Sequence, residues 1–327
     1  MSTEAAKRVV FKCAFGGNNG WGHVIRCSAL AGEFRRRGWE TILWGEGESG
    51  SLPEDVASSF SRFDGKGQEL ASILIIDEMY TEQAELEALA TAWKTTHPDG
   101  VVAGVDDMQR RSMRGFDLVL NTEIGLREAA YEASTVLLGE RYALLRMGFG
   151  EASDPVAFTL PSDLVPVLVM MGGTDPFGYL PKVLTGLSRF SAAKFAPVVV
   201  AGESGGLEGC LEPFIWSRML KRVGASELAS WMEICRFGIV ACGTSLYESA
   251  AMRLPFVGVS LVDNQTATAR KVKELWGMPI LHCESERRGE LDLEESLRKV
   301  MGKEKDAYSE VDTNGAARVF EALKVLL

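Results

Sequence analysis

The chain has 327 residues, of which 46% are hydrophobic and 24% are charged, as in a globular protein long enough for two cores. Its net charge of −10 argues against a nucleic-acid groove or an anionic membrane surface as the main partner. The polar start from Met1 to Arg8 precedes no apolar signal region, and no apolar run is long enough to span a membrane. Six scattered cysteines without a C-x-x-C pair are typical of reduced thiols. We therefore expect a cytoplasmic protein.

Short apolar runs alternate with longer amphipathic segments in the first part of the chain, which is typical of βαβ units and a parallel sheet. A strand is predicted over Val9–Ala14, followed by a loop rich in Gly and Asn and a helix over about Trp21–Arg37. The other predicted elements are the strands Glu40–Trp44, Ile73–Asp77, Val101–Asp106, Leu118–Asn121 and Thr135–Leu138 and the helix Thr81–Thr95.

A segment rich in glycine, proline and serine, Gly148 to Val165, interrupts this pattern and predicts a linker. We therefore place a first domain at residues 1–150 and a second at 151–327. The pattern predicts an α/β protein of two Rossmann-like lobes that face each other across a cleft. The closing helix could pack on either lobe. In the second half the predicted strands are Val165–Met171, Pro197–Ala201, Phe237–Ala241 and Phe256–Val259, and the predicted helices are Glu227–Cys235, Leu246–Met252, Gln265–Trp276 and Gly315–Leu327.

The junction between the first strand and the first helix reads Gly20-Trp21-Gly22-His23. Glycines there let a ligand approach the backbone, and the free amides of a first helical turn attract phosphate. The spacing matches neither a dinucleotide fingerprint nor a Walker loop. The positive end of the helix dipole disfavours an imidazolium, so His23 could accept a proton from water or an alcohol. From its position alone, His23 could equally cap or pack the helix.

Two strand ends of the second lobe carry small residues, at Gly172–Asp175 and Cys242–Ser245. Their amides suit a diphosphate, and Glu248, one turn into the following helix, could accept hydrogen bonds from both ribose hydroxyls. The alternative is ordinary turn chemistry, with Thr244 as a helix cap and Glu248 as a solvated acid. Two such loops in one lobe favour a nucleotide site.

Metal chemistry finds little support in the residue spacing. No histidine or cysteine cluster has the spacing of zinc ligands. Asp106 and Asp107 could hold Mg²⁺, but such a pair more often ends a strand and begins a turn. We predict neither a metal nor a cofactor.

These motifs together give the chain a resemblance to a family of nucleotide-sugar enzymes. It resembles the UDP-2,4-diacetamido-2,4,6-trideoxy-β-L-altropyranose hydrolases of pseudaminic acid biosynthesis and related spore-coat polysaccharide proteins. More distantly it is similar to the lipid-II-forming N-acetylglucosaminyltransferase, which shares the GT-B fold. The most specific matches are Gly-x-Gly-His-Val-x-Arg-Cys at 20–27 and Leu-Leu-Gly-x-Arg-Tyr-Ala-Leu-Leu-Arg at 137–146. The first of these lies within the matching stretch Phe11–Ala31, and the other stretches are Ile75–Asp77, Val105–Asp107, Val167–Pro176 and Ser226–Val272.

The resemblance implies roles for particular residues. His23 would be the general base that activates water at the anomeric carbon, with Tyr80 as a second catalytic residue. The sugar and diphosphate side of the cleft would comprise Gly20, Gly22 and Arg26. In the second lobe the ligands of UDP would be Gly173, Thr174, Ser245, Leu246 and Glu248, with Ser226 near the uracil and Asn264 and Gln265 facing the sugar or phosphates.

Two segments depart from the family pattern. Where the family reads Arg-x-Asp at the end of the first strand, this chain has Lys12, Cys13 and Ala14, so a carboxylate expected at the sugar is missing. Where the family reads Asp-His-Tyr, the chain has Asp77-Glu78-Met79-Tyr80, so the histidine is gone and the tyrosine is displaced by one position. Both departures bear on the identity of the substrate more than on the fold.

The function predicted on this basis is a metal-independent hydrolase in nonulosonic acid or surface-glycan biosynthesis. It would cleave the anomeric C–O bond of a UDP-activated deoxy, acetamido sugar with inversion. One alternative is an inverting GT-B glycosyltransferase in which His23 deprotonates an acceptor hydroxyl. Another is a nucleotide-sugar-binding protein without catalysis, against which His23 argues. The sugar, the base of the nucleotide and the oligomeric state stay open.

Overall fold

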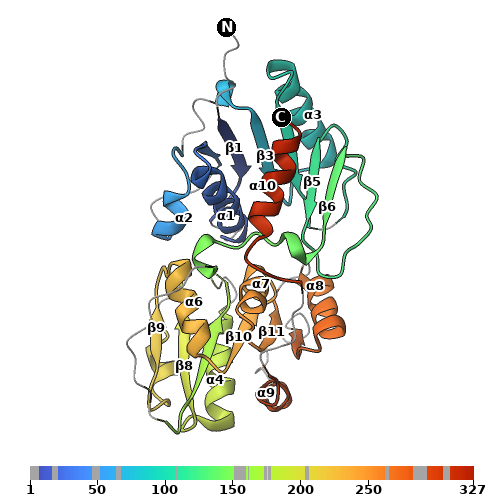
Figure 1. Ribbon diagram of the computed structural model, residues 1–327. Coiled ribbons are helices and arrows are strands. Elements are labelled where there is room, and N and C mark those ends of the chain that lie inside the picture. Colours follow the sequence, from blue (N-terminus) through green and yellow to red (C-terminus); the bar gives the residue numbers. More distant parts are fainter. Residues whose placement is uncertain are drawn as a thin grey trace. The chain divides into compact units, whose positions relative to one another are not determined.

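The computed structural model describes residues 7–16, 21–45, 52–63, 68–107, 109–150, 160, 162–172, 175, 178–202, 206–261, 265–282, 293–304 and 310–327. The chain folds into two compact units (Figure 1), one formed by Met1–Met147 with Asp312–Leu327 and the other by Gly148–Val311. Each unit contains one six-stranded parallel sheet. The prediction of two Rossmann-like α/β lobes is confirmed for each unit. Among the described residues, no helix has the length and apolar character that crossing a bilayer requires.

The sheet of the first unit has the strand order β2-β1-β3-β4-β5-β6. From β1 the chain first moves outward to β2 and then returns to the other side of β1, so the order reverses between β1 and β3. Ligands of open α/β sheets bind beyond the carboxyl ends of the strands at such a reversal. The strands are β1 (Arg8–Cys13), β2 (Glu40–Trp44), β3 (Ile73–Asp77), β4 (Val101–Val105), β5 (Leu118–Asn121) and β6 (Thr135–Leu138).

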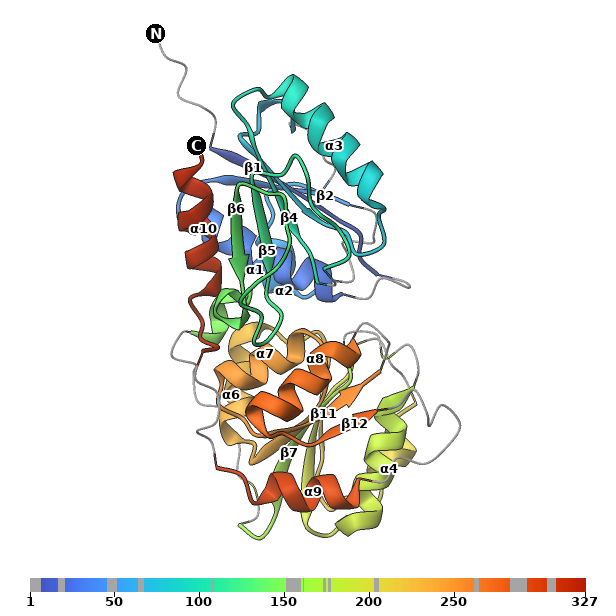
Figure 2. The same cartoon turned by 90° about the vertical axis from the view of Figure 1, so that its right-hand side faces the viewer.

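Alternation along the strands divides the core of this unit between two faces of the sheet. Val9, Phe11 and Cys13 of β1 pack in a cluster with helix α1 (Gly22–Arg36), whereas Val10 packs on the other face with helix α3 (Gln83–Thr96). Figure 2 shows α1 and α3 on opposite sides of the sheet. Because successive side chains point to opposite faces, the same alternation also predicts the face on which a polar residue just after a strand lies. A short helix, α2 (Glu54–Ser58), packs against α1.

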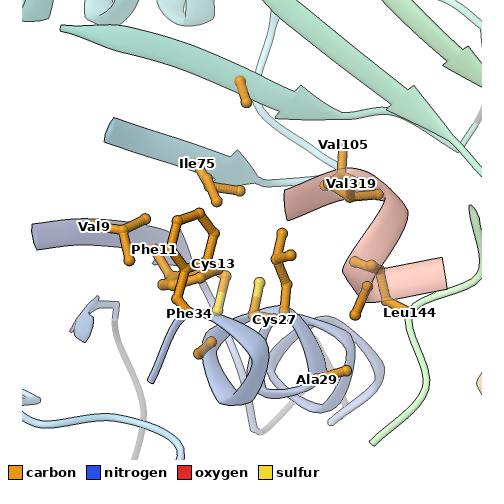
Figure 3. Close-up of a cluster of buried hydrophobic side chains, with 14 of the residues drawn as sticks. Val9, Phe11, Cys13, Cys27, Ala29, Phe34, Ile75, Val105, Leu144 and Val319 are labelled. Atoms are coloured by element: carbon orange, nitrogen blue, oxygen red, sulfur yellow. The ribbon is translucent and has the colours of Figure 1, made fainter. Parts of the chain in front are cut away.

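The C-terminal helix α10 (Gly315–Val325) belongs to the first unit, so the predicted second domain, 151–327, is wrong over its last residues. Its apolar stripe completes the α1 cluster, and the rings of Phe34 and Phe320 meet edge to face with centroids 4.8 Å apart. Figure 3 shows Val319 of α10 and Leu144 as members of the same buried cluster. The apolar surface that α1 leaves uncovered is the physical reason why the chain returns.

The second unit has the strand order β12-β11-β10-β7-β8-β9 and reverses between β7 and β10. Its strands are β7 (Val165–Met170), β8 (Phe195–Val200), β9 (Arg218–Leu220), β10 (Phe237–Ala241), β11 (Phe256–Ser260) and β12 (Ile280–His282). Its helices are α4 (Tyr179–Ser191), α5 (Glu208–Leu211), α6 (Ala225–Ile234), α7 (Thr244–Ala251), α8 (Thr266–Lys271), which continues as a π-helical turn over Val272–Trp276, and α9 (Glu294–Met301).

Candidate active site

A cluster of polar side chains lies beyond the carboxyl ends of β1, β3 and β4. Ile73 and Ile75 pack on the α1 face of the sheet, so Asp77, two residues further on, points to the same face. Helix α1 presents His23 and Arg26, which are three residues apart and therefore neighbours on the helix surface. Strand register and helix spacing thus bring a histidine, an arginine and a fully buried carboxylate together.

His23 and Asp77 form a hydrogen-bonded pair. Nδ1 of His23 lies 2.7 Å from Oδ1 of Asp77. Nη2 of Arg26 is also near Nδ1, at 3.1 Å, but a guanidinium only donates. The shorter contact to the carboxylate therefore decides the tautomer of the neutral ring: Nδ1 carries the proton, and Nε2 has the lone pair. An imidazole in this state is a proton acceptor held in a fixed direction.

Arg26 joins Asp77 to a second carboxylate, Asp107, which follows β4. Its Nε and Nη2 donate to Oδ2 and Oδ1 of Asp77, each at 2.5 Å. Its Nη1 and Nη2 donate to Oδ1 and Oδ2 of Asp107 at 2.7 and 2.8 Å. The resemblance assigned Arg26 to substrate binding; in the structure its guanidinium is occupied by these two carboxylates.

Burial and charge act against each other in this cluster. Burial raises the pKa of Asp77, but Arg26 and His23 outweigh it and hold the pKa well below its usual range. Burial lowers the pKa of Arg26, and Asp107 and Asp77 more than offset this effect. A hydrogen bond with Cys13, together with burial, raises the pKa of the Cys27 thiol, which donates to Oδ2 of Asp77 at 3.6 Å. Figure 3 shows the two sulfur atoms close together.

A pocket of about 270 Å³ opens beside His23 and Asp77. Lys12 and Glu78 form an ion pair in it with a separation of 2.7 Å, and the Lys12 ammonium lies 4.8 Å from the centre of the Trp44 ring. Thr81 donates to the other oxygen of Glu78 at 2.8 Å. The two positions that depart from the family pattern therefore meet in one ion pair. The remaining lining residues are Ala14, Gly45, Met79 and Tyr80.

Gly45, directly after β2, lines one side of this pocket, and its position requires a glycine. A Cβ on Gly45 would lie 2.0 Å from the carbonyl oxygen of Cys13. Any side chain at Gly45 would therefore force residue 45 away from the end of β1. Trp44 lines the pocket, whereas Trp21, two residues before His23, is buried in the α1 cluster.

Asp106 points to the opposite face of the sheet from Asp107 and is fully engaged. Arg111 donates to its Oδ1 from Nη2 at 2.6 Å, and the Tyr131 hydroxyl donates to its Oδ2 at 2.7 Å. Each of the two aspartates is thus bonded to an arginine. Across the described parts of the chain, no three or more His, Cys, Asp or Glu side chains are arranged to hold a metal.

The second unit offers an uncapped helix start at its own reversal point. Met170 of β7 and Val240 of β10 are paired, and α7 begins directly after β10. Gly243 occupies the N-cap, where no side chain among the described residues makes a capping bond, so the interpretation of Thr244 as the cap is wrong. Glu248 is only 4% exposed, which contradicts its interpretation as a solvated acid.

The other predicted ligands of this unit belong to several different elements. Ser245 and Leu246 are buried in its first turn. Gln265 accepts a hydrogen bond from the amide of Leu261 at 2.9 Å, and its Nε2 lies near Gly243. Ser226 is exposed at the start of α6. Asp175 accepts from the amides of Tyr179 and Leu180 and so caps α4. Gly20, Gly173, Thr174 and Asn264 lie outside the described residues.

Of the sites predicted in the first unit, His23 and Arg26 meet in the cluster. Gly22 is the exposed first residue of α1. Tyr80 lines the pocket but is 73% exposed. Sequence reasoning missed the contributions of Asp77, Asp107 and the Lys12–Glu78 pair. The available signal was the alternation of side chains between the two faces of the sheet, continued past the end of each strand.

No protein-family model matches the chain. The spore coat polysaccharide biosynthesis protein SpsG of Bacillus subtilis (strain 168) is 24% identical over 272 residues, which cover 78% of each chain. The calicheamicin glycosyltransferase CalG4 has a TM-score of 0.63 at 12% identity and covers 98% of both chains. The structure of S. aureus MnaA with UDP has a TM-score of 0.62 at 11% identity, covering 97% of this chain and 96% of MnaA. The chain therefore has the GT-B fold of glycosyltransferases.

Proposed function

We propose that this chain is a nucleotide-sugar enzyme that cleaves an anomeric C–O bond, with His23 as the general base. The observation that carries the proposal is the His23–Asp77 pair, in which the carboxylate holds Nδ1 and leaves Nε2 without a protein partner in that pair, beside a pocket at the strand-order reversal of the first sheet. A histidine oriented by a carboxylate is a common way to activate a hydroxyl nucleophile.

The nucleoside diphosphate is assigned to the second unit. Its support is the uncapped start of α7 at the reversal between β7 and β10, where backbone amides can bind phosphate oxygens. The buried carboxylate of Glu248, one turn further on, can accept hydrogen bonds from ribose hydroxyls. The presence of UDP in the MnaA structure supports a uridine diphosphate as the first nucleotide to test.

The proposed reaction is a single displacement. Nε2 of His23 takes the proton of a hydroxyl nucleophile as its oxygen bonds to the anomeric carbon. The bond between that carbon and the diphosphate oxygen breaks, and the electron pair leaves with the nucleoside diphosphate. Asp77 stabilises the imidazolium that forms. One displacement inverts the anomeric configuration.

The nucleophile that the comparisons support is a hydroxyl of an acceptor, because glycosyltransferases such as CalG4 share the fold along the whole chain. The likeness to SpsG supports a place in polysaccharide biosynthesis. Hydrolysis is the second candidate, and the size of the pocket favours it. Its volume of about 270 Å³ lies just below the range of roughly 300–1,000 Å³ typical of ligand sites, which suits one sugar ring and a water molecule.

The test is a panel of nucleotide-sugars incubated with and without carbohydrate or lipid acceptors, with release of free nucleotide as the readout. Release only in the presence of an acceptor would establish transfer. Release without an acceptor, performed in H₂¹⁸O, should place the label on the sugar and none on the nucleotide. Label in the nucleotide would mean P–O cleavage and would overturn the proposed reaction. The anomeric configuration of early product, observed by NMR, should be inverted.

A further inference from the structure

Asp107 and Asp77, the carboxylate that pairs with His23, bind the same guanidinium, that of Arg26. Arg26 holds Asp77 through Nε and Nη2 and Asp107 through Nη1 and Nη2. Asp107 lies on the α1 face because it follows Val105 of that face by two residues. The Asp106 side chain, held by Arg111 and Tyr131, anchors the adjoining backbone.

The charge of the cluster depends on the second carboxylate. One arginine and two aspartates give a net charge of −1 while His23 is neutral. Without Asp107, the positive charge of Arg26 would neutralise Asp77, and an imidazolium at His23 would face an ion pair with no net charge. With Asp107 present, the imidazolium completes a neutral cluster.

We propose that Asp107 is a positioning residue that sets the proton affinity of His23 through Arg26. It engages one side of the guanidinium, so that Asp77 retains the charge needed to stabilise an imidazolium. The consequence for turnover rests on the proposed function, whereas the effect on proton binding by His23 does not. A merely structural Arg26–Asp107 ion pair would affect stability and leave that proton binding unchanged.

The other groups that face His23 do not supply this charge. Lys12 and Glu78 share the pocket and pair with each other, so their charges largely compensate. Tyr80 lines the same pocket, and the protonated thiol of Cys27 donates to Asp77 from behind.

The experiment is an NMR pH titration of the histidine rings of the full chain. The chain has three histidines, and His23→Ala identifies the signal of His23, which leaves His97 and His282 as internal references. In Asp107→Asn the titration midpoint of His23 should fall by about half to one pH unit, because removal of a nearby negative charge disfavours the imidazolium. Asp107→Glu keeps the charge and should restore the midpoint.

Asp312→Asn is the matched control, since Asp312 also forms a bidentate pair with an arginine, Arg318, in the same unit. It should leave the His23 midpoint unchanged. An unchanged midpoint in a folded Asp107→Asn chain would overturn the proposal. Asp107 is 27% exposed, so folding should survive, and Asp107→Ser provides the same comparison if the asparagine variant fails to fold.

Turnover separates this inference from the proposed function. If both hold, Asp107→Asn should lower kcat about tenfold with little change in KM and move the acid limb of the pH profile to lower pH. If His23→Ala retains full turnover, the proposed function fails, and the NMR midpoint still decides the role of Asp107.

Discussion

Oδ1 of Asp77 lies 2.7 Å from Nδ1 of His23 and 2.5 Å from Nη2 of Arg26, so a single oxygen atom of the carboxylate serves both side chains. The oxygen accepts from a histidine whose protonation state can change and from an arginine whose protonation state does not. This shared acceptor connects the orientation of His23 to the stability of the fold, and the first two predictions separate these contributions.

Replacement of His23 should greatly slow turnover without lowering the affinity for the nucleotide. His23→Ala should lower kcat by about 10² to 10⁴, the usual contribution of a general base, while calorimetry shows an unchanged affinity for UDP. His282→Ala is the control, because His282 is exposed at the end of β12. Turnover at the unsubstituted rate in purified His23→Ala would remove His23 from the mechanism.

Asp77→Asn should lower the free energy of unfolding by about 3 kcal/mol near neutral pH, because it leaves a buried arginine with one carboxylate fewer. The pKa of Asp77 lies well below its usual range in the folded chain, so the ionised group stabilises the fold above the ordinary value of about 3.9. As the pH falls below that value, the unfolded chain binds the proton first and the stabilisation is lost.

Urea unfolding measures this difference between the two chains. The difference should be present at neutral pH and shrink below about pH 4. Asp312→Asn, at a more exposed ion pair, should change stability by no more than about 1 kcal/mol. A difference for Asp77→Asn that stays constant into strong acid would contradict the role of its charge.

Glu248→Ala should weaken UDP binding by roughly 1–3 kcal/mol, the cost of leaving the ribose hydroxyls poorly paired. Because Glu248 is buried in α7, Glu248→Gln provides a variant of the same shape. Glu227→Ala, at an exposed acid of α6, is the control. Unchanged affinity in both Glu248 variants by calorimetry would assign Glu248 to the structure of the helix alone.

Activity should survive EDTA. The carboxylates of Asp106 and Asp107 are each bonded to an arginine, and helix amides can stabilise a departing diphosphate in place of a cation. The measurement is turnover after chelation, with and without added Mg²⁺. Loss that Mg²⁺ restores would show that a cation binds during the reaction.

The sequence predicted the strands of the first unit closely, because each is an apolar run bounded by polar or turn residues. It did not predict β9 or β12, since three residues are too few for a periodic signal. The prediction began β8 at Pro197, which lacks a backbone donor, whereas the strand begins at Phe195 and includes the proline in its pairing with β7.

The candidate site was less accessible to prediction than the fold. Position and motif identified His23, but the importance of Asp77 depends on three segments that only the folded sheet brings together. Likewise, Lys12 and Glu78 looked like independent departures from a family pattern, and the structure makes them partners. Alternation along a strand predicts the face of the sheet to which each side chain points. It does not predict which residue of another segment that side chain will contact.

The return of the chain to its first unit has a consequence for dissecting the protein. Two covalent crossings join the units, so no single cut releases an intact first unit. A fragment that ends at the first crossing would lose Val319, Phe320 and Leu323 and expose the apolar surface that they cover. A soluble first unit would have to carry residues 312–327 as a fused tail or receive them as a separate peptide. Binding of that peptide to the truncated unit would then show that the face of the sheet covered by α1, the helix that carries His23, is correctly folded.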